Sequence, residues 1–140
     1  MAGIGVVLGF SAGAALGECA RSDFEAVVDS AAGSLRDMNA ANKPKFQDKL
    51  RQLRDKRGWT QEQFVKEATP FVLDNQIATY DHQSALLLER IAAGGEAGAS
   101  AATPDCAMLD SLKASMKLLV DTQAAKWSYM TDRIDAELAK

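Results

Sequence analysis

Residues 104–140 read PDCAMLDSLKASMKLLVDTQAAKWSYMTDRIDAELAK, which is the longest amphipathic segment of the sequence. Its large side chains recur every three or four residues, which is the spacing of one face of an α-helix. The residues of this stripe are Leu109, Leu112, Met116, Leu119, Gln123, Trp127, Met130, Ile134 and Leu138. A helix of this length needs several partner helices to cover its apolar face. The sequence therefore predicts a helical bundle organised around a long C-terminal helix.

The composition of the whole chain supports an all-α fold. A length of 140 residues suggests one domain. Residues with high helix propensity are abundant, prolines number three, and Val and Ile are too sparse for a sheet. We expect one domain over residues 18–140, built as a small bundle of four to five antiparallel helices.

Two helices are expected before residue 58. Ser22 and Glu25 have the spacing of a capping box, which predicts a helix over 22–39 followed by a turn at 39–43. Pro44 suits the first turn of a helix, because the N–H that proline lacks would be unpaired there. Gly58 is placed to end this second helix in a left-handed conformation.

The middle of the chain contains a second capping box and a predicted break. Thr60 and Gln63 have the capping-box spacing and predict a helix start. Pro70 removes a backbone donor and follows a residue suited to cap a new helix, so we predict a helix break near Pro70. The low-complexity stretch 94–103 predicts a mobile loop.

The first seventeen residues, MAGIGVVLGFSAGAALG, carry no charged side chain. An apolar run that ends in small residues is typical of a signal peptide, with cleavage expected before Glu18. No basic residue precedes Arg21, which is atypical of a signal peptide. Glycine recurs every fourth residue, so a retained membrane or oligomer helix is one alternative, and a flexible tail is another. We favour the signal peptide, which predicts a periplasmic or secreted protein, with a membrane tether through residues 1–17 as the alternative.

The chain has two cysteines, Cys19 and Cys106, each at a predicted helix start. In an exported protein such a pair predicts a disulfide, whereas a reducing cytosol would leave two thiols. Bridged Cα atoms lie within about 7 Å, but the first and fourth helices of a four-helix up-and-down bundle start at opposite ends. The disulfide therefore predicts that the chain reverses at Pro70, which gives five segments.

Charge is concentrated in residues 43–57, which hold seven basic and two acidic side chains. This segment has a charge of +5 within a chain of net charge −3, so the remainder carries −8. Long basic side chains beside an apolar stripe are typical of a solvated helix edge or of a face that binds an anionic partner. The residues predicted to bind such a partner are Lys45, Lys49, Arg51, Arg54 and Lys56. The net negative charge argues against non-specific nucleic-acid binding.

No catalytic or metal-binding set is apparent in the sequence. His82 is the only histidine, and no suitably spaced nucleophile or ligand set accompanies it. We therefore expect neither catalysis nor a cofactor.

Two short stretches resemble known families. Residues 50–64, LRQLRDKRGWTQEQF, resemble the opening of a phage-repressor-type helix-turn-helix domain, although TPFVL at 69–73 replaces the expected recognition helix. Residues 59–63, WTQEQ, resemble the L-T-x-x-Q signature of small helical periplasmic chaperones, with Trp59 in place of leucine and no second copy. These departures are too large for functional residues to be carried over.

Together these observations predict an exported helical binding protein that is chaperone-like or envelope-associated. Its partner would be an unknown protein or an anionic envelope surface, and a homo-oligomer is left open. The alternative is a cytosolic DNA-binding regulator that uses residues 50–64. The apolar N-terminus and the cysteine pair favour the first hypothesis.

Overall fold

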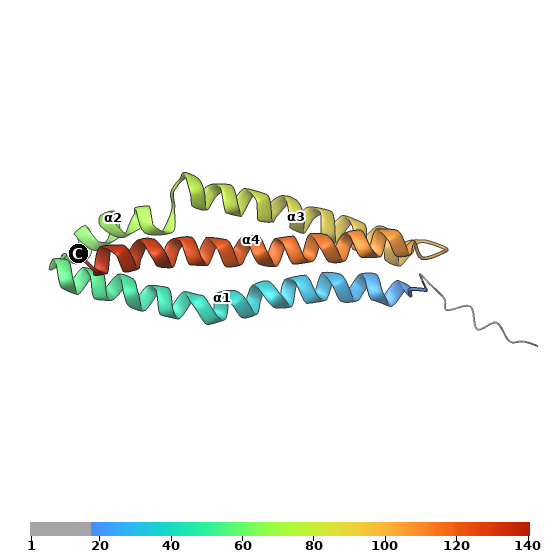
Figure 1. The fold of residues 1–140 in the computed structure, drawn as a ribbon, viewed down its shortest axis with the longest axis horizontal. Helices are drawn as coiled ribbons and strands as arrows, with labels where there is room; N and C mark the ends of the chain where they lie inside the picture. Colours follow the sequence, from blue (N-terminus) through green and yellow to red (C-terminus); the bar gives the residue numbers. More distant parts are fainter. Residues whose placement is uncertain (1–17) are drawn as a thin grey trace, which may run out of the picture.

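The computed structural model describes residues 18–140, and this part of the chain contains four α-helices and no strand (Figure 1). The helices are α1 (Arg21–Arg57), α2 (Gln61–Val72), α3 (Asn75–Ser100) and α4 (Cys106–Leu138). The predicted all-α bundle and its long C-terminal helix are therefore confirmed. Residues 1–17, which include the predicted cleavage site and the glycine ladder, lie outside the described residues.

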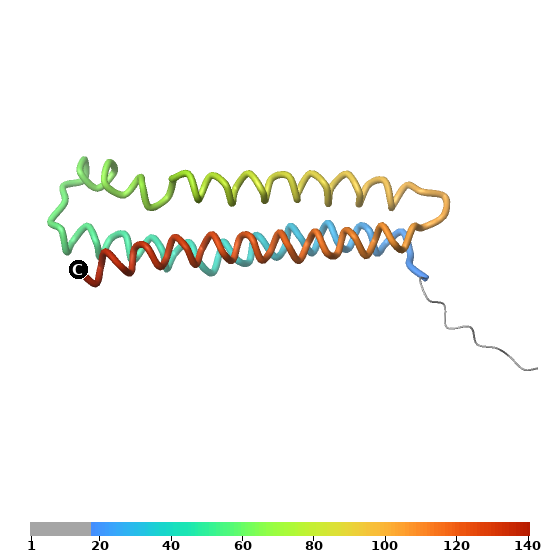
Figure 2. The backbone as a smooth tube through the Cα atoms, turned by 45° about the horizontal axis from the view of Figure 1, so that its top comes forward, coloured from blue at the N-terminus to red at the C-terminus, as the bar shows by residue number. Residues whose placement is uncertain are grey.

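The four helices form three parallel-sided arms (Figure 2). We call the end of the bundle that contains the two cysteines the disulfide end, and the opposite end the far end. Helix α1 runs from the disulfide end to the far end. Helices α2 and α3 follow one another back along the bundle as the second arm, and α4 then returns beside α1. Helices α1, α3 and α4 pack against one another along their lengths, whereas α2 packs more sparsely and mainly against α4.

Helix α1 is continuous, so the predicted turn at 39–43 is wrong. Pro44 lies inside the helix, where it cannot donate to the carbonyl four residues earlier, and α1 changes direction near its middle (Figure 1). Apolar side chains on both sides of Pro44 face the other two arms, including Ala31 and Phe46, and their burial keeps the helix intact. Local proline chemistry therefore bends α1 without ending it.

The start of α1 also differs from the prediction. The Asp23 carboxylate accepts a hydrogen bond from the Ala20 backbone N–H at 2.8 Å, and the helix begins at Arg21. Ser22 therefore lies inside the first turn, and the predicted Ser22–Glu25 capping box does not form.

Both predicted signals around residue 60 are confirmed. Gly58 ends α1 with φ of 66°, a left-handed conformation that costs glycine little. The Gln63 N–H donates to Thr60 Oγ1 at 3.2 Å, and the Thr60 N–H donates to Gln63 Oε1 at 2.9 Å. This reciprocal pair begins α2.

The break near Pro70 is present, but it lies at Leu73–Asp74, after α2 has continued through Pro70 to Val72. The chain does not reverse there, because α2 and α3 follow the same direction (Figure 2). The five-segment count is therefore wrong. The bundle instead has an odd number of arms, three, which places the starts of α1 and α4 at one end.

Most of the predicted loop at 94–103 is helical. Helix α3 extends to Ser100, and Gly95 and Gly98 are buried. A methyl group on Gly98 would overlap the Phe24 ring, and one on Gly95 would overlap Val28. The glycines thus permit close contact between α3 and α1, and only residues 101–105 form the connection to α4.

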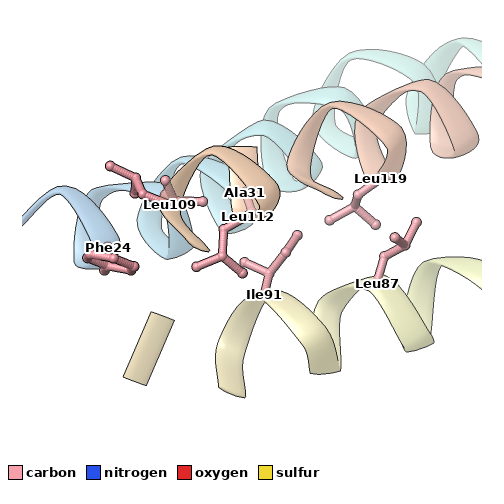
Figure 3. Packing of buried hydrophobic residues seen from close by; sticks show 8 residues of the cluster. Phe24, Ala31, Leu87, Ile91, Leu109, Leu112 and Leu119 are labelled. Carbon is pink, nitrogen blue, oxygen red and sulfur yellow. The ribbon is translucent and has the colours of Figure 1, made fainter. Parts of the chain in front are cut away.

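The core has two apolar clusters. The cluster at the disulfide end, in which Ile91 faces Leu112 and Leu87 faces Leu119 (Figure 3), contains Phe24, Val27, Ala31, Leu87, Ile91, Leu109, Leu112 and Leu119. The cluster at the far end contains Phe46, Leu50, Leu53, Ala68, Ile77, Met130 and Ile134. Between them, the buried Gln123 Nε2 donates to Ser84 Oγ at 2.6 Å. None of the four described helices is long and apolar enough to cross a membrane.

Candidate functional site

The two cysteines form the predicted disulfide at the helix starts of α1 and α4. The Cα atoms of Cys19 and Cys106 are 5.7 Å apart, and the bridge spans 87 positions of sequence. Nearby, Arg21 Nη2 donates to the Ala102 carbonyl at 3.2 Å. Closing a loop of this length stabilises the folded state by about 4–5 kcal/mol in the chain-entropy model.

Part of the basic segment 43–57 faces the end of α4. Lys49 Nζ pairs with Asp135, Lys56 Nζ donates to the Leu138 carbonyl, and Arg57 Nη2 pairs with Glu137 Oε2 at 2.9 Å. Cations favour the negative end of a helix, and exposed ion pairs of this kind contribute about 0–1 kcal/mol each. Of the five predicted binding residues, Lys49 and Lys56 therefore have structural contacts with α4.

These contacts also change the acidity of Glu137. The hydrogen bond from Lys140 is the largest effect and lowers the pKa of the Glu137 carboxyl. Burial opposes it, and the hydrogen bond from Arg57 lowers the pKa further. The carboxylate is thus held in its charged form at the far end of the bundle.

The other side of the same segment lines a groove between α1 and α2, here called the basic groove. Its volume is about 350 Å³. Its lining residues are Gln47, Leu50, Arg51, Arg54, Gln61, Phe64 and Ala68. Leu50 and Ala68 are buried at the floor. In the basic groove, the predicted binding residues Arg51 and Arg54 adjoin a concave apolar surface.

The two arginines of the basic groove differ in their contacts. Arg54 donates from Nε to Asp55 Oδ1 at 3.2 Å, and its guanidinium carbon lies 5.5 Å from the Phe64 ring centroid. Arg51 is exposed and forms no ion pair within residues 18–140. Lys45 is also exposed, lies outside the groove lining, and forms no ion pair with the described residues. Arg51 is therefore the most available cation of the groove.

Helical spacing extends both walls of the basic groove. On α1, Lys43 lies four residues before Gln47 and therefore on the same stripe. On α2, successive steps of four, three and four residues lead from Gln61 to Val65, Ala68 and Val72. Because Gln61 and Ala68 line the groove, this spacing places Val65 and Val72 on the groove side of α2. Val65 is 61% exposed and Val72 is 45% exposed. The groove thus has a basic wall and an apolar wall.

A polar clamp at the helix break positions α2, and sequence reasoning missed it. Asp74 Oδ1 accepts from the Ile77 N–H at 2.7 Å, while Oδ2 accepts from Tyr129 Oη at 2.6 Å and from Arg133 Nη1 at 2.8 Å. Arg133 also donates to the Pro70 carbonyl at 2.7 Å. The clamp therefore ties the end of α2 and the start of α3 to α4.

The clamp shifts two pKa values in opposite directions. Hydrogen bonds from Ile77 and Tyr129 lower the pKa of the Asp74 carboxyl, and the Arg133 charge lowers it further. The hydrogen bond to Asp74, and then burial, raise the pKa of the Tyr129 hydroxyl. The only sequence signal for this site was the position of Asp74 before an apolar helix, because its partners lie more than fifty residues away.

His82 is exposed on α3. Within residues 18–140, no three His, Cys, Asp or Glu side chains gather in a way that could hold a metal ion. The chain matches no protein-family model, and neither the curated proteins nor the solved structures contain a match to it. The basic groove is therefore assigned as the candidate site from its geometry alone.

Proposed function

We propose that this chain is an exported helical binding protein that acts without catalysis and takes acidic protein segments in the basic groove. One observation carries the proposal: Arg51 and Arg54 lie beside an apolar floor formed by Leu50, Phe64 and Ala68.

The chemistry of the groove favours a segment that carries both carboxylates and apolar side chains. Guanidinium groups present planar donors that match carboxylates. Apolar side chains that enter the floor gain about 25 cal/mol for each Å² removed from water. Because these groups line a concave groove between two helices, a side-chain-bearing segment fits them better than a flat lipid surface does.

The disulfide supports the exported location, because such bonds persist in oxidising compartments. The intact mass of the natively produced chain tests this part directly. We expect a mass that lacks residues 1–17 and two cysteine hydrogens. A full-length chain with two free thiols would contradict export.

The DNA-binding alternative gains no support from the arrangement of α2 and α3. The two helices of a helix-turn-helix cross at about 90–120°. Here α3 continues from α2 along the same arm of the bundle (Figure 2). We therefore propose binding of protein segments and not of DNA.

A peptide titration tests the basic groove. Fluorescence anisotropy would measure the binding of a labelled amphipathic helical peptide that has Glu on one face and Leu on the other. A control peptide of the same design has Lys in place of Glu. We expect only the acidic peptide to bind, and Arg51→Glu to weaken its affinity at least tenfold. The matched control is Lys45→Glu, which makes the same charge change on α1 outside the groove.

Equal effects of the two substitutions would contradict the groove assignment. Vesicles with and without phosphatidylglycerol form a second arm of the experiment. Binding to the anionic vesicles but not to the peptide would identify an envelope surface as the partner in place of a protein.

A further inference from the structure

A second groove lies at the disulfide end, between α1 and α3, and its charge is opposite to that of the basic groove. Glu25 and Asp29 on α1 and Glu96 on α3 line it, with Val28, Ala92 and Ala99 supplying apolar surface. Its volume is about 400 Å³. We call it the acidic groove.

Both grooves lie on one face of the bundle. The acidic groove is bounded by α1 and α3, and the basic groove by α1 and α2. Since α2 and α3 form one arm, both grooves follow the seam between α1 and that arm (Figure 2). The face is therefore acidic at the disulfide end and basic at the far end.

The strip between the two grooves carries both apolar and charged side chains. On α3, Leu88 lies four residues before Ala92 on the same wall and is 38% exposed. On α1, the stripe that joins Asp29 to Gln47 passes through the exposed Ala32, Arg36, Ala40 and Lys43. Small apolar side chains therefore alternate with basic ones on α1 between the two grooves.

We propose that this face binds a second copy of the same chain in antiparallel orientation. A two-fold axis brings identical patches together, so each contact occurs twice. An axis near Ala40 places Asp29 of one copy opposite Arg51 of the other, and Glu25 near Arg54. Asp29 and Arg51 are 22 residues apart, which corresponds to about 33 Å of helix, so the paired region is long.

Charge decides the orientation. A parallel arrangement would place the acidic groove against its own copy and the basic groove against its own copy, and such like-charge contacts disfavour binding. The antiparallel arrangement pairs opposite charges at both ends. Ala40 at the axis has a small side chain, which allows the two α1 helices to approach closely.

This inference rests on the proposed function in one respect, because it uses the same basic groove. In the dimer, the acidic end of the second copy occupies the basic groove when no other partner is bound. An acidic segment of another protein would then compete with the dimer.

Sedimentation velocity on the native oxidised chain tests the inference. We expect a monomer–dimer equilibrium that stops at the dimer, with a dimer Kd that weakens at least tenfold between 50 and 500 mM NaCl, because exposed charges are screened. Two reversal variants sharpen the test. One is Lys43→Glu with Arg51→Glu, and the other is Glu25→Lys with Asp29→Lys.

Each reversal variant alone should be monomeric, because the net charge of its face has the same sign at both ends. An equimolar mixture of the two should form a heterodimer, since one face then has a net negative charge at both ends and the other a net positive charge. Recovery on mixing also shows that both variants are folded. The matched controls, Lys45→Glu and Asp110→Lys, change charge off this face and should leave the dimer Kd within about twofold of the original.

Several results would overturn the inference: a monomer at all concentrations up to about 1 mM, a dimer insensitive to the reversals, two monomeric variants that fail to associate on mixing, or growth beyond the dimer. The peptide titration separates the two proposals. A monomer that binds the acidic peptide retains the proposed function and rejects the dimer. A dimer that is sensitive to the reversals but never binds the peptide supports the dimer and rejects the proposed function.

Discussion

The two halves of the bundle are held together by different means. At the disulfide end, α1, α3 and α4 are joined by a covalent bridge and by close helix contact at Gly95 and Gly98. At the far end, α2 buries only Ala68 and depends on the Asp74 clamp, while exposed ion pairs attach α1 to α4. The more firmly held half is therefore not the half that contains the proposed binding surface. The basic groove lies in the half where one wall, α2, is weakly held.

Loss of the disulfide, which stabilises the disulfide end, should cause the largest decrease in stability. Reduction, or Cys19→Ser with Cys106→Ser, removes about 4–5 kcal/mol of loop-closure stabilisation. For a chain of this size that lowers the Tm by roughly 10–20 °C. Calorimetry of the oxidised and reduced forms measures the change. An unchanged Tm would show that the bridge does not stabilise this half.

The glycine contact should give the next largest effect. Gly98→Ala places a methyl group against the Phe24 ring, and overpacking of this kind costs about 1–3 kcal/mol. Gly33→Ala is the matched control, because its nearest neighbour would be the flexible end of Arg36 at 3.5 Å. Alanine there should stabilise helix α1 by about 0.5–1 kcal/mol. Urea unfolding of both variants checks the opposite signs, and equal shifts would contradict the close packing.

The clamp should have a smaller and more local effect. Asp74→Ala removes the cap of α3 and the acceptor for Tyr129 and Arg133. Loss of a helix cap costs about 0.5–2 kcal/mol. Limited proteolysis should cut first near the α2–α3 junction in this variant. Asp121→Ala, which loses only an exposed pair with Lys117, should leave the cleavage pattern unchanged.

Lowering the pH should loosen the far end before the disulfide end. Of the predicted changes in stability, we expect this one to be the smallest. The pKa values of Asp74 and Glu137 are lowered in the folded state, so their contribution is present above the ordinary carboxyl pKa and is lost as pH falls through the folded pKa. The raised pKa of Tyr129 has the reverse consequence, because its contribution is lost as pH rises through the folded pKa above about 10.

Tryptophan emission can follow this local loosening, because Trp59 and Trp127 are the two tryptophans and both pack at the far end. Between pH 7 and pH 3 we expect the emission to change before far-ultraviolet circular dichroism does. Coincident changes would show that the two halves respond to acid as one unit.

The sequence predicts contacts within one helix better than contacts between helices. The stripe of α4 and the caps at Gly58 and Thr60 were predictable, because each depends on neighbours within a few residues. Pro44 and the glycines of α3 led to wrong predictions of a turn and a loop, because local propensity was outweighed by the burial of Phe46 and Phe24. Tertiary packing regularly overrides propensity in this way.

The candidate site was only partly predictable for the same reason. The clustering of basic residues in 43–57 is visible in the sequence, and the groove does contain Arg51 and Arg54. The pairing of Lys49 with Asp135 and of Lys56 with Leu138 joins positions more than eighty residues apart. Only the fold separates the cations that hold α4 from those that line the basic groove.

Amide hydrogen exchange, resolved by residue on the native oxidised protein, compares the stability of the two halves. We expect the amides of α2 to exchange through local opening faster than those of α3 near Ile91 and of α4 near Leu112. We also expect the acidic peptide to slow exchange in α2 while leaving the disulfide end unchanged. Uniform exchange across all four helices, or protection by the peptide that appears only at the disulfide end, would contradict the division into a stable half and a binding half.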